Sequence, residues 1–379
     1  MNVIYLDNNA TTPMLPAVWE AMLPYWCDRP GNPASSHRFG RQARQALETA
    51  REQIAALLDA HPDEVLFTSG ATEANNLAIF GLVGAAVGSL VTSRIEHPSI
   101  VEPIHALAAK GFAETLLPVT ADGSIDVAHA SFADDVRLVA IMLANHETGA
   151  LQPIDTLVKR LDGKAPFHCD AAAAAGKIPI SFRQLGVTSL TVSAHKFHGP
   201  KGIGALLLRR TKKLRPLFFG GHQQHGKRPG TEPVPLAIGM AKALEWSLQN
   251  LAANRVQLLD LRRRFLDHLR DQAAPVILNG PETDGLPHAV NLSFPGCQAD
   301  ALLLSLDLAD VACSTGSACS SGSLLPSPVL TAMGKTGDVL HSAMRFTLSP
   351  LLTVADVEES ARRIAHCVNK LRLLSDDVV

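Results

Sequence analysis

The sequence has little charge of either sign and no block of one sign. Its 379 residues contain 34 Lys and Arg against 36 Asp and Glu, which gives a formal net charge of −2. Proteins that bind nucleic acid neutralise phosphates with clustered Lys and Arg. We therefore expect no nucleic-acid partner.

Long apolar runs are missing too, and cysteine is sparse. No apolar run reaches membrane-spanning length, and the start, MNVIYLDNNATTP, lacks the basic and apolar regions of a signal peptide. The six cysteines are Cys27, Cys169, Cys297, Cys313, Cys319 and Cys367. They are scattered, without the density of a disulfide framework. We expect a cytoplasmic protein with reduced thiols and no membrane segment.

Short apolar stretches alternate with helical ones over the first two thirds of the chain. Residues 40–59 place their apolar side chains on one helical face, and helices are also expected after 69, near 98–110 and near 153–161. The stretches with strand character are 64–68, 89–93, 136–144, 166–171, 190–194 and 202–210. This alternation predicts an α/β domain whose mostly parallel sheet is covered on both faces.

The length and the 46% hydrophobic content predict two domains. A long helical stretch at 235–271 leaves the first domain, and the rest has an α+β pattern. We expect a large α/β domain at 15–255 and a smaller α+β domain made of 1–14 and 256–379.

Chemically capable residues follow several predicted strands. The segment SGATEANN (69–76) offers backbone N–H groups, hydroxyls and a helix dipole to a phosphate, although an ordinary capped helix has the same pattern. His97, Asp170 and Lys196 also follow strands, and a buried lysine can form a Schiff base. Carboxyl ends of parallel strands share one edge, so these side chains should converge there.

A zinc site with His195 and His198 is an alternative for the same region. The spacing of these two histidines and a distant cysteine matches no closed tetrahedral pattern. We therefore predict no metal site.

Eight ordered motifs carry a resemblance to a known family. They are YLDNNATTP, GNPASSH, FTSGATEANNLAI, EHPSI, SAHKFHGPKGIGALLLRR, GGHQQHGKRPGT, STGSACSSGSLLPS and RFTLS. In this order they resemble the cysteine desulfurases of the NifS/IscS-like group, which are pyridoxal 5'-phosphate (PLP) enzymes of the class V aminotransferase superfamily. The resemblance runs from residue 4 to about 370 and implies the type I fold of PLP-dependent transferases.

The resemblance implies a role for each matching position. Lys196 would be the Schiff-base lysine, His97 would stack on the ring and assist proton transfer, and Cys319 would take the sulfur. Asn32 and Arg345 would bind the substrate carboxylate. The implied cofactor-binding residues are Ala71, Thr72, His97, His146, Asp170, Ser193, His195, Lys196 and Thr231, with Thr231 lent to the neighbouring subunit of a homodimer.

Two positions depart from the family pattern. The family usually has asparagine where this chain has His146 and glutamine where it has Ala173, both near the cofactor's 3-hydroxyl. Histidine can still form a hydrogen bond there, whereas alanine cannot. Losing one bond costs roughly 1 kcal/mol, so we expect an active enzyme with altered cofactor electronics.

The resemblance predicts a cysteine desulfurase that converts L-cysteine to L-alanine and leaves a persulfide on Cys319. The Ser/Gly-rich segment around Cys319 suits a thiol that travels between the pocket and an acceptor, such as an iron–sulfur scaffold protein. The alternatives are a selenocysteine lyase or aminotransferase of the same superfamily, and a weakly active homologue that binds partners. Cys313 is expected to be a buried structural thiol.

Overall fold

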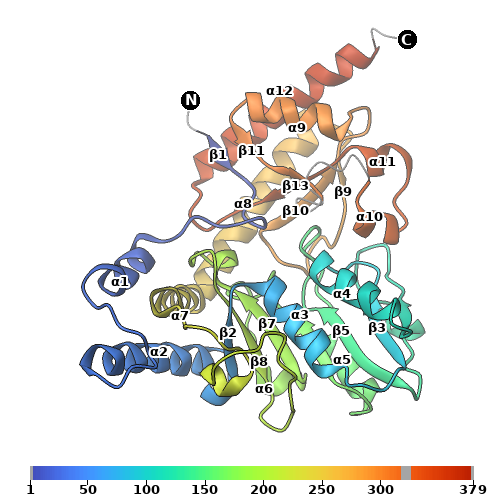
Figure 1. The fold of residues 1–379 in the computed structure, drawn as a ribbon. Coiled ribbons are helices and arrows are strands. Elements are labelled where there is room, and N and C mark those ends of the chain that lie inside the picture. Colours follow the sequence, from blue (N-terminus) through green and yellow to red (C-terminus); the bar gives the residue numbers. More distant parts are fainter. Residues whose placement is uncertain (1–2, 317–325, 377–379) are drawn as a thin grey trace.

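A seven-stranded sheet forms the centre of the larger part of the molecule (Figure 1). The computed structural model describes residues 3–316 and 326–376. In spatial order the strands are β2 (Val65–Thr68), β8 (Gly204–Leu208), β7 (Ser189–Ser193), β6 (Phe167–Asp170), β5 (Val136–Met142), β3 (Ser89–Ser93) and β4 (Ala113–Leu117). Strand β8 runs opposite to the other six strands of this sheet, and the remaining pairs are parallel, which confirms the predicted mostly parallel sheet.

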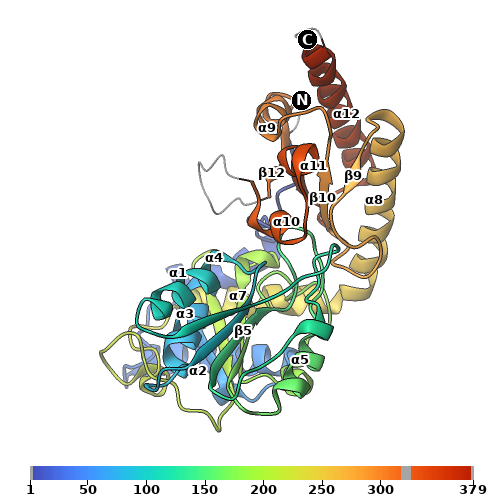
Figure 2. The same cartoon turned by 90° about the vertical axis from the view of Figure 1, so that its right-hand side faces the viewer.

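Helices cover both faces of this sheet, as Figures 1 and 2 show. They are α1 (Pro16–Cys27), α2 (Arg38–Leu57), α3 (Ala71–Leu82), α4 (Pro98–Ala108), α5 (Ile154–Leu161), α6 (Phe182–Leu185) and α7 (Val234–Gln249). Successive side chains of a strand point to opposite faces of the sheet, and both faces are covered by helices. Thus Phe67 packs in the cluster of α2 and α7, and its neighbour Leu66 packs in the cluster of α3.

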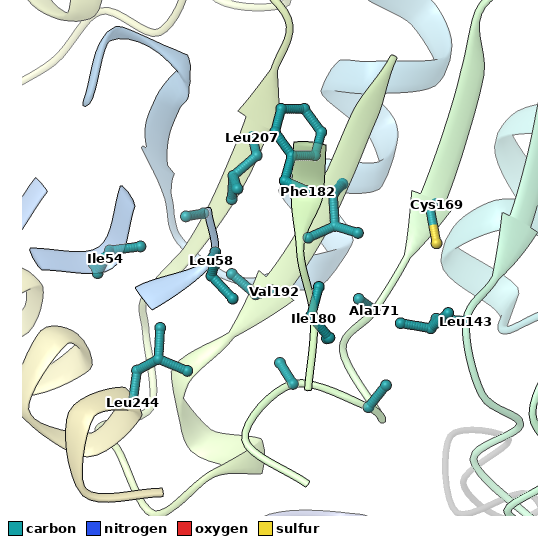
Figure 3. Close-up of a cluster of buried hydrophobic side chains, with 14 of the residues drawn as sticks. Ile54, Leu58, Leu143, Cys169, Ala171, Ile180, Phe182, Val192, Leu207 and Leu244 are labelled. Carbon is teal, nitrogen blue, oxygen red and sulfur yellow. The ribbon is translucent and has the colours of Figure 1, made fainter. Parts of the chain in front are cut away.

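The largest buried cluster lies on the face covered by α2, α5, α6 and α7. Figure 3 shows part of it, where Leu58 and Leu244 approach Val192 and Leu207 from the sheet, with Phe182 nearby. Close packing of this kind makes the strands a rigid support. The loops that follow the strands are therefore held in defined positions.

The smaller part has its own buried cluster and sheet. Its elements are α8 (Leu251–Gln272), β9 (Ile277–Leu278), β10 (Ala289–Ser293), α9 (Ala299–Leu308), β11 (Val311–Ala312), β12 (Ser314–Thr315), α10 (Pro328–Ala332), α11 (Gly337–His341), β13 (Ala343–Thr347) and α12 (Val354–Asp376). Strands β12, β13, β10 and β9 form an antiparallel sheet, which packs against α8, α9 and α12.

The N-terminal segment lies in the smaller part. Strand β1 (Ile4–Tyr5) pairs in parallel with β11, and Ile4 and Leu6 are buried in the same cluster as α8, α9 and α12. We propose residues 15–255 and residues 1–14 plus 256–379 as the two domains, a division that the separate clusters support.

The helical stretch at 235–271 is two helices, not one. Helix α7 ends at Gln249 and α8 begins at Leu251, with Asn250 between them. The Asn250 side-chain amide donates to the Trp246 carbonyl at 2.8 Å. The Asn250 backbone N–H donates to the same carbonyl at 3.1 Å, and the Asn250 backbone, with φ of −98° and ψ of 5°, departs from helical values and separates the two helices. Within the described residues, no helix is long and apolar enough to cross a membrane.

Candidate active site

A cavity of about 580 Å³ opens at the carboxyl ends of the parallel strands. Most of the predicted site residues line it: Ala71, Thr72, His97, His146, Asp170, Ser193, His195, Lys196 and Arg345. All but Arg345 follow or end a strand of the large sheet, so the parallel topology brings them to one edge. Arg345 comes from β13 of the smaller part, which places the cavity between the two parts.

One end of the cavity is suited to an anion. Helix α3 points its N-terminus at the cavity, where Gly70, Ala71 and Thr72 form part of the wall. Strand β8 passes close beside this turn: a Cβ atom added at Gly204 would lie only 2.9 Å from the Gly70 Cα, so only glycine fits there. Burial, and then the charge of Lys196, lower the pKa of His195 to about 4, so its imidazole is neutral near pH 7.

Lys196 is held between the two parts of the molecule. It follows β7 in a short 3₁₀ turn, and its ammonium donates to the backbone carbonyls of Asn9 and Ala10, the latter at 3.1 Å. Sequence reasoning assigned Asn9 and Ala10 no role. Backbone carbonyls carry no side-chain signature, so only the fold could show that this segment reaches the lysine.

His97 and His146 face one another in the cavity wall. Their ring centroids lie 5.4 Å apart in an edge-to-face arrangement. Burial lowers the pKa of His146 well below its usual value, with the charges of His97, Arg345 and Lys196 acting in the same direction. His146 is therefore a neutral hydrogen-bonding group in the cavity, and Ala173, which also lines it, offers no side-chain donor.

Asp170 lies at the end of β6 and is buried. Its Oδ1 accepts from the Ala172 backbone N–H at 2.9 Å, and its Oδ2 accepts from the Asn75 side-chain amide at 2.7 Å. Both carboxylate oxygens thus have a hydrogen-bond donor, and the two bonds fix the orientation of the group. A negative charge in this position can pair with a cationic ring of a ligand. Sequence reasoning missed Asn75, which sits one turn inside α3.

Arg345 is almost fully buried and ties three segments together. Its Nη2 lies 2.8 Å from the Asp7 carboxylate, and its Nη1 donates to the Gly316 carbonyl at 3.3 Å. A guanidinium that lines the cavity can also form paired hydrogen bonds with a substrate carboxylate.

Two predicted residues do not line this cavity, and a third belongs to the part of the chain that the structure does not describe. Asn32 is exposed, and its side-chain oxygen accepts from the Ala34 backbone N–H at 2.9 Å in a local turn. The structure thus does not place Asn32 beside Arg345, as the resemblance had implied. Thr231 is exposed and does not line the cavity of its own chain. Cys319 lies outside the described residues.

The cavity lining suits a ligand with several polar groups, such as PLP. Several buried polar atoms of its lining have no hydrogen-bond partner among residues 3–316 and 326–376: Thr11 Oγ1, His146 Nδ1, Ser193 Oγ, His195 Nδ1 and Arg345 Nε. Buried polar groups normally have partners, so this set indicates a bound group that supplies them. Within the same residues, no cluster of three His, Cys, Asp or Glu could hold a metal ion.

Glu96, directly before His97, is a buried carboxyl behind the cavity. It lies 2.5 Å from Ser93 Oγ and 2.8 Å from the Met142 backbone N–H, and so joins the ends of β3 and β5. Burial raises its pKa to about 8, the hydrogen bond from Ser93 opposes this, and the charge of Asp170 adds to it. The folded protein thus keeps a proton that the unfolded chain loses above about pH 4.5.

Stability should therefore fall as the pH rises from about 4.5 to 8. We expect Glu96→Gln, which retains the shape without the charge, to be more stable than the wild type by about 4 kcal/mol at pH 8 and by little at pH 4.5. Urea unfolding at both pH values measures this. Glu102→Gln, an exposed carboxyl on α4, is the control; an equal response in both variants would contradict the prediction.

Comparison with known proteins gives one consistent result. The family model described as "Aminotransferase class-V" matches residues 4–359. The chain is 42% identical over 378 residues to "Cysteine desulfurase IscS" of Dictyoglomus turgidum, which covers 98% of this chain and 96% of that protein.

Solved structures agree with this result. A "NifS-like protein" superposes with a TM-score of 0.91 at 32% identity, covering 97% of this chain and all of that one. A structure described as "SspA in complex with cysteine" superposes with a TM-score of 0.80 at 33% identity, covering 92% and 99% of the two chains.

Proposed function

This chain belongs to the aminotransferase class-V family and is a PLP-dependent enzyme, and we propose that it is a cysteine desulfurase that converts L-cysteine to L-alanine. The observation that supports this most directly is the meeting of Lys196, Asp170 and Arg345 in one cavity. A reactive amine, a buried carboxylate and a guanidinium are the groups needed to attach, activate and orient an amino acid.

PLP, when bound, supplies a carbonyl for covalent attachment and an electron sink. The residues of the chain do the rest. Ala71 and Thr72 at the start of α3, with Ser193 and His195, would hold the phosphate, and His97 and His146 would lie beside the ring. His97 also assists proton transfer.

Asp170 would pair with the ring nitrogen. Lys196, which lines the cavity, would carry protons to and from the substrate Cα in its neutral amine form. Arg345 binds the substrate carboxylate.

The sulfur leaves by attack of the Cys319 thiolate on the sulfur of L-cysteine. The C–S bond breaks, an S–S bond forms on Cys319, and the carbon that loses sulfur gains a proton. L-cysteine and one protein thiol thus become L-alanine and one persulfide, with no outside oxidant. Burial raises the pKa of Cys313 to about 12, so this thiol stays protonated and is a poor competitor.

The test is to incubate the purified holoenzyme with L-cysteine and to measure alanine together with persulfide mapped by mass spectrometry. We expect one persulfide on Cys319 in a single turnover. Cys319→Ser should lower sustained alanine formation by at least about 100-fold, because the nucleophile is lost. Cys313→Ser is the matched control and should keep near-normal activity.

Other results would lead elsewhere. Alanine without persulfide on Cys319 would contradict the proposed sulfur path. Release of selenium from selenocysteine in Cys319→Ser, with no action on cysteine, would favour a selenocysteine lyase. Consumption of an amino acid only in the presence of a keto acid would favour an aminotransferase.

We also propose a homodimer in which Thr231 of one subunit reaches the phosphate site of the other. Thr231 is exposed and outside its own cavity, and large apolar side chains lie exposed nearby in the sequence and on α1 and α2: Trp19, Trp26, Phe39, Phe218 and Phe219. Burying such apolar side chains in a subunit interface removes them from water and so favours association. A monomer in light-scattering measurements would contradict this.

The persulfide then passes to a cytoplasmic acceptor protein, for which an iron–sulfur scaffold is our proposal. The relative named IscS supports this choice. The five described cysteines are all free thiols, which agrees with a reducing compartment.

A further inference from the structure

A buried chain of hydrogen bonds runs behind the cavity and joins its two ring-facing groups. Asn75, which is fully buried, uses Nδ2 to contact both Asp170 Oδ2 at 2.7 Å and Ser99 Oγ at 2.8 Å. Ser99 Oγ in turn lies 2.8 Å from His97 Nδ1. Asn75 thus stands between Asp170 and His97, although it lies behind the wall that they form.

The chain continues away from the cavity to a second buried histidine. Asn75 Oδ1 lies 3.0 Å from His168 Nε2, and His168 Nδ1 lies 2.8 Å from Ser189 Oγ. His168 and Ser189 are both fully buried on neighbouring strands, β6 and β7. Burial lowers the pKa of His168 to about 3, so this imidazole is neutral.

The direction of every bond in this chain follows from the charge of Asp170. A carboxylate only accepts, so Asn75 must present its NH₂ group to Asp170, and its two protons serve Asp170 and Ser99. Asn75 Oδ1 can then only accept, which requires the proton of His168 on Nε2. His168 Nδ1 must accept in turn, so the Ser189 hydroxyl donates to it.

The other branch is oriented as well. The Ser99 backbone N–H donates to His97 Nδ1 at 3.1 Å, and the Ser99 hydroxyl, which accepts from Asn75, is free to donate to the same nitrogen. His97 Nδ1 is therefore an acceptor, and a neutral His97 carries its proton on Nε2. The two ring-facing groups share one asparagine, which can satisfy both only in this orientation.

We propose that Asn75 is a positioning residue that couples Asp170 to His97, with His168 and Ser189 behind it fixing its orientation. This inference rests on the proposed function for the presence of PLP in the cavity, whereas the hydrogen bonds of the chain do not depend on desulfurase activity. A buried network that is fully satisfied specifies one arrangement, because any rotated amide would set two acceptors against each other. Asn75 thereby keeps the Asp170 carboxylate and the His97 ring in place relative to the cofactor.

The test uses PLP-loaded full-length protein labelled with ¹⁵N-histidine. In the wild type we expect His168 to show a protonated Nε2 and a bare Nδ1. In Asn75→Ala, His168 loses its acceptor, so its ring should change to a tautomer mixture, and the His97 signals should shift. Affinity for PLP should fall about tenfold, and kcat about tenfold or more with KM changed less.

Two further variants separate the branches. Ser99→Ala should move the His97 signals and leave the His168 tautomer unchanged, and it keeps the proposal testable if Asn75→Ala does not fold. His168→Phe removes the donor to Asn75 Oδ1 and should weaken PLP binding. His168→Gln, whose amide can still donate to Asn75 Oδ1, should keep near-normal PLP affinity.

Thr92→Val is the matched control for mere loss of a buried hydrogen bond. Thr92 is fully buried on β3 and donates to the Ala140 carbonyl at 2.9 Å, outside the chain. The Thr92→Val variant should have a lower free energy of unfolding but unchanged histidine signals. A wild-type His168 protonated on Nδ1, or Asn75→Ala signals and PLP affinity equal to those of Thr92→Val, would overturn the proposal. If the tautomers behave as expected while the wild type makes no alanine, only the proposed function fails.

Discussion

Lys196→Ala should abolish turnover, lowering kcat by at least about 1,000-fold. The substitution removes both the amine that attaches the cofactor and the base at the substrate Cα, and proton transfer by a positioned side chain alone is worth about 10²- to 10⁴-fold. Steady-state alanine formation measures the loss. The visible absorbance of the bound cofactor should change at the same time, because the covalent link to the protein is gone.

Lys196→Arg separates attachment from charge. An arginine can retain a donor to the Asn9 and Ala10 carbonyls but cannot form the covalent link. It should be as inactive as Lys196→Ala. Lys212→Ala, at an exposed position, should behave like the wild type. Substantial turnover in Lys196→Arg would mean that Lys196 is not the attachment site.

Arg345→Ala should damage both substrate binding and stability. The substrate carboxylate loses its guanidinium, so KM for L-cysteine should rise by about 100-fold, in line with the loss of a charge-assisted pair. Asp7 also loses its partner at 2.8 Å. Because the Asp7 side chain is 19% exposed, we expect a cost of about 2–3 kcal/mol, below most of the range of about 3–5 kcal/mol for a fully buried pair. Initial rates and urea unfolding measure the two effects.

A surface pair provides the control for the second effect. Arg362 lies 2.7 Å from Glu359 on α12, but the Arg362 side chain is 63% exposed, against 2% for Arg345. Arg362→Ala should therefore cost less than about 1 kcal/mol. The double variant Asp7→Asn with Arg345→Ala should recover part of the lost stability, since it no longer leaves a charge without its partner. Equal losses for Arg345 and Arg362 would contradict the role given to burial.

Much of the fold could be predicted because its signals are local. Strands such as 64–68 and 89–93 are short, apolar and followed by turn residues, and the structure places β2 and β3 there. The exception at Asn250 is instructive. The helical period continues through it, so the sequence pattern suggests one helix, while the non-helical backbone of Asn250 divides the stretch into two.

The candidate site could be predicted in part for a related reason. Once a parallel sheet is expected, residues after its strands must share an edge, so Lys196, Asp170 and His97 are brought together by topology alone. Asn32 was expected beside Arg345 and is not found there, because its side chain satisfies its own turn at Ala34. Local hydrogen bonding in a loop is not visible in the order of motifs.

The sequence by itself determined the parallel sheet, the chemistry of the strand ends and the family, since each depends on residue type and order along the chain. Only the tertiary structure decided that the Asn9 and Ala10 carbonyls hold Lys196, that Arg345 pairs with Asp7, and that Asn75 joins Asp170 to His97. Arg345 and Asp7 are 338 residues apart in the chain, and Asn75 and Asp170 are 95 apart. Hydrogen bonds depend on distance and direction in space, and these exist only after the chain has folded.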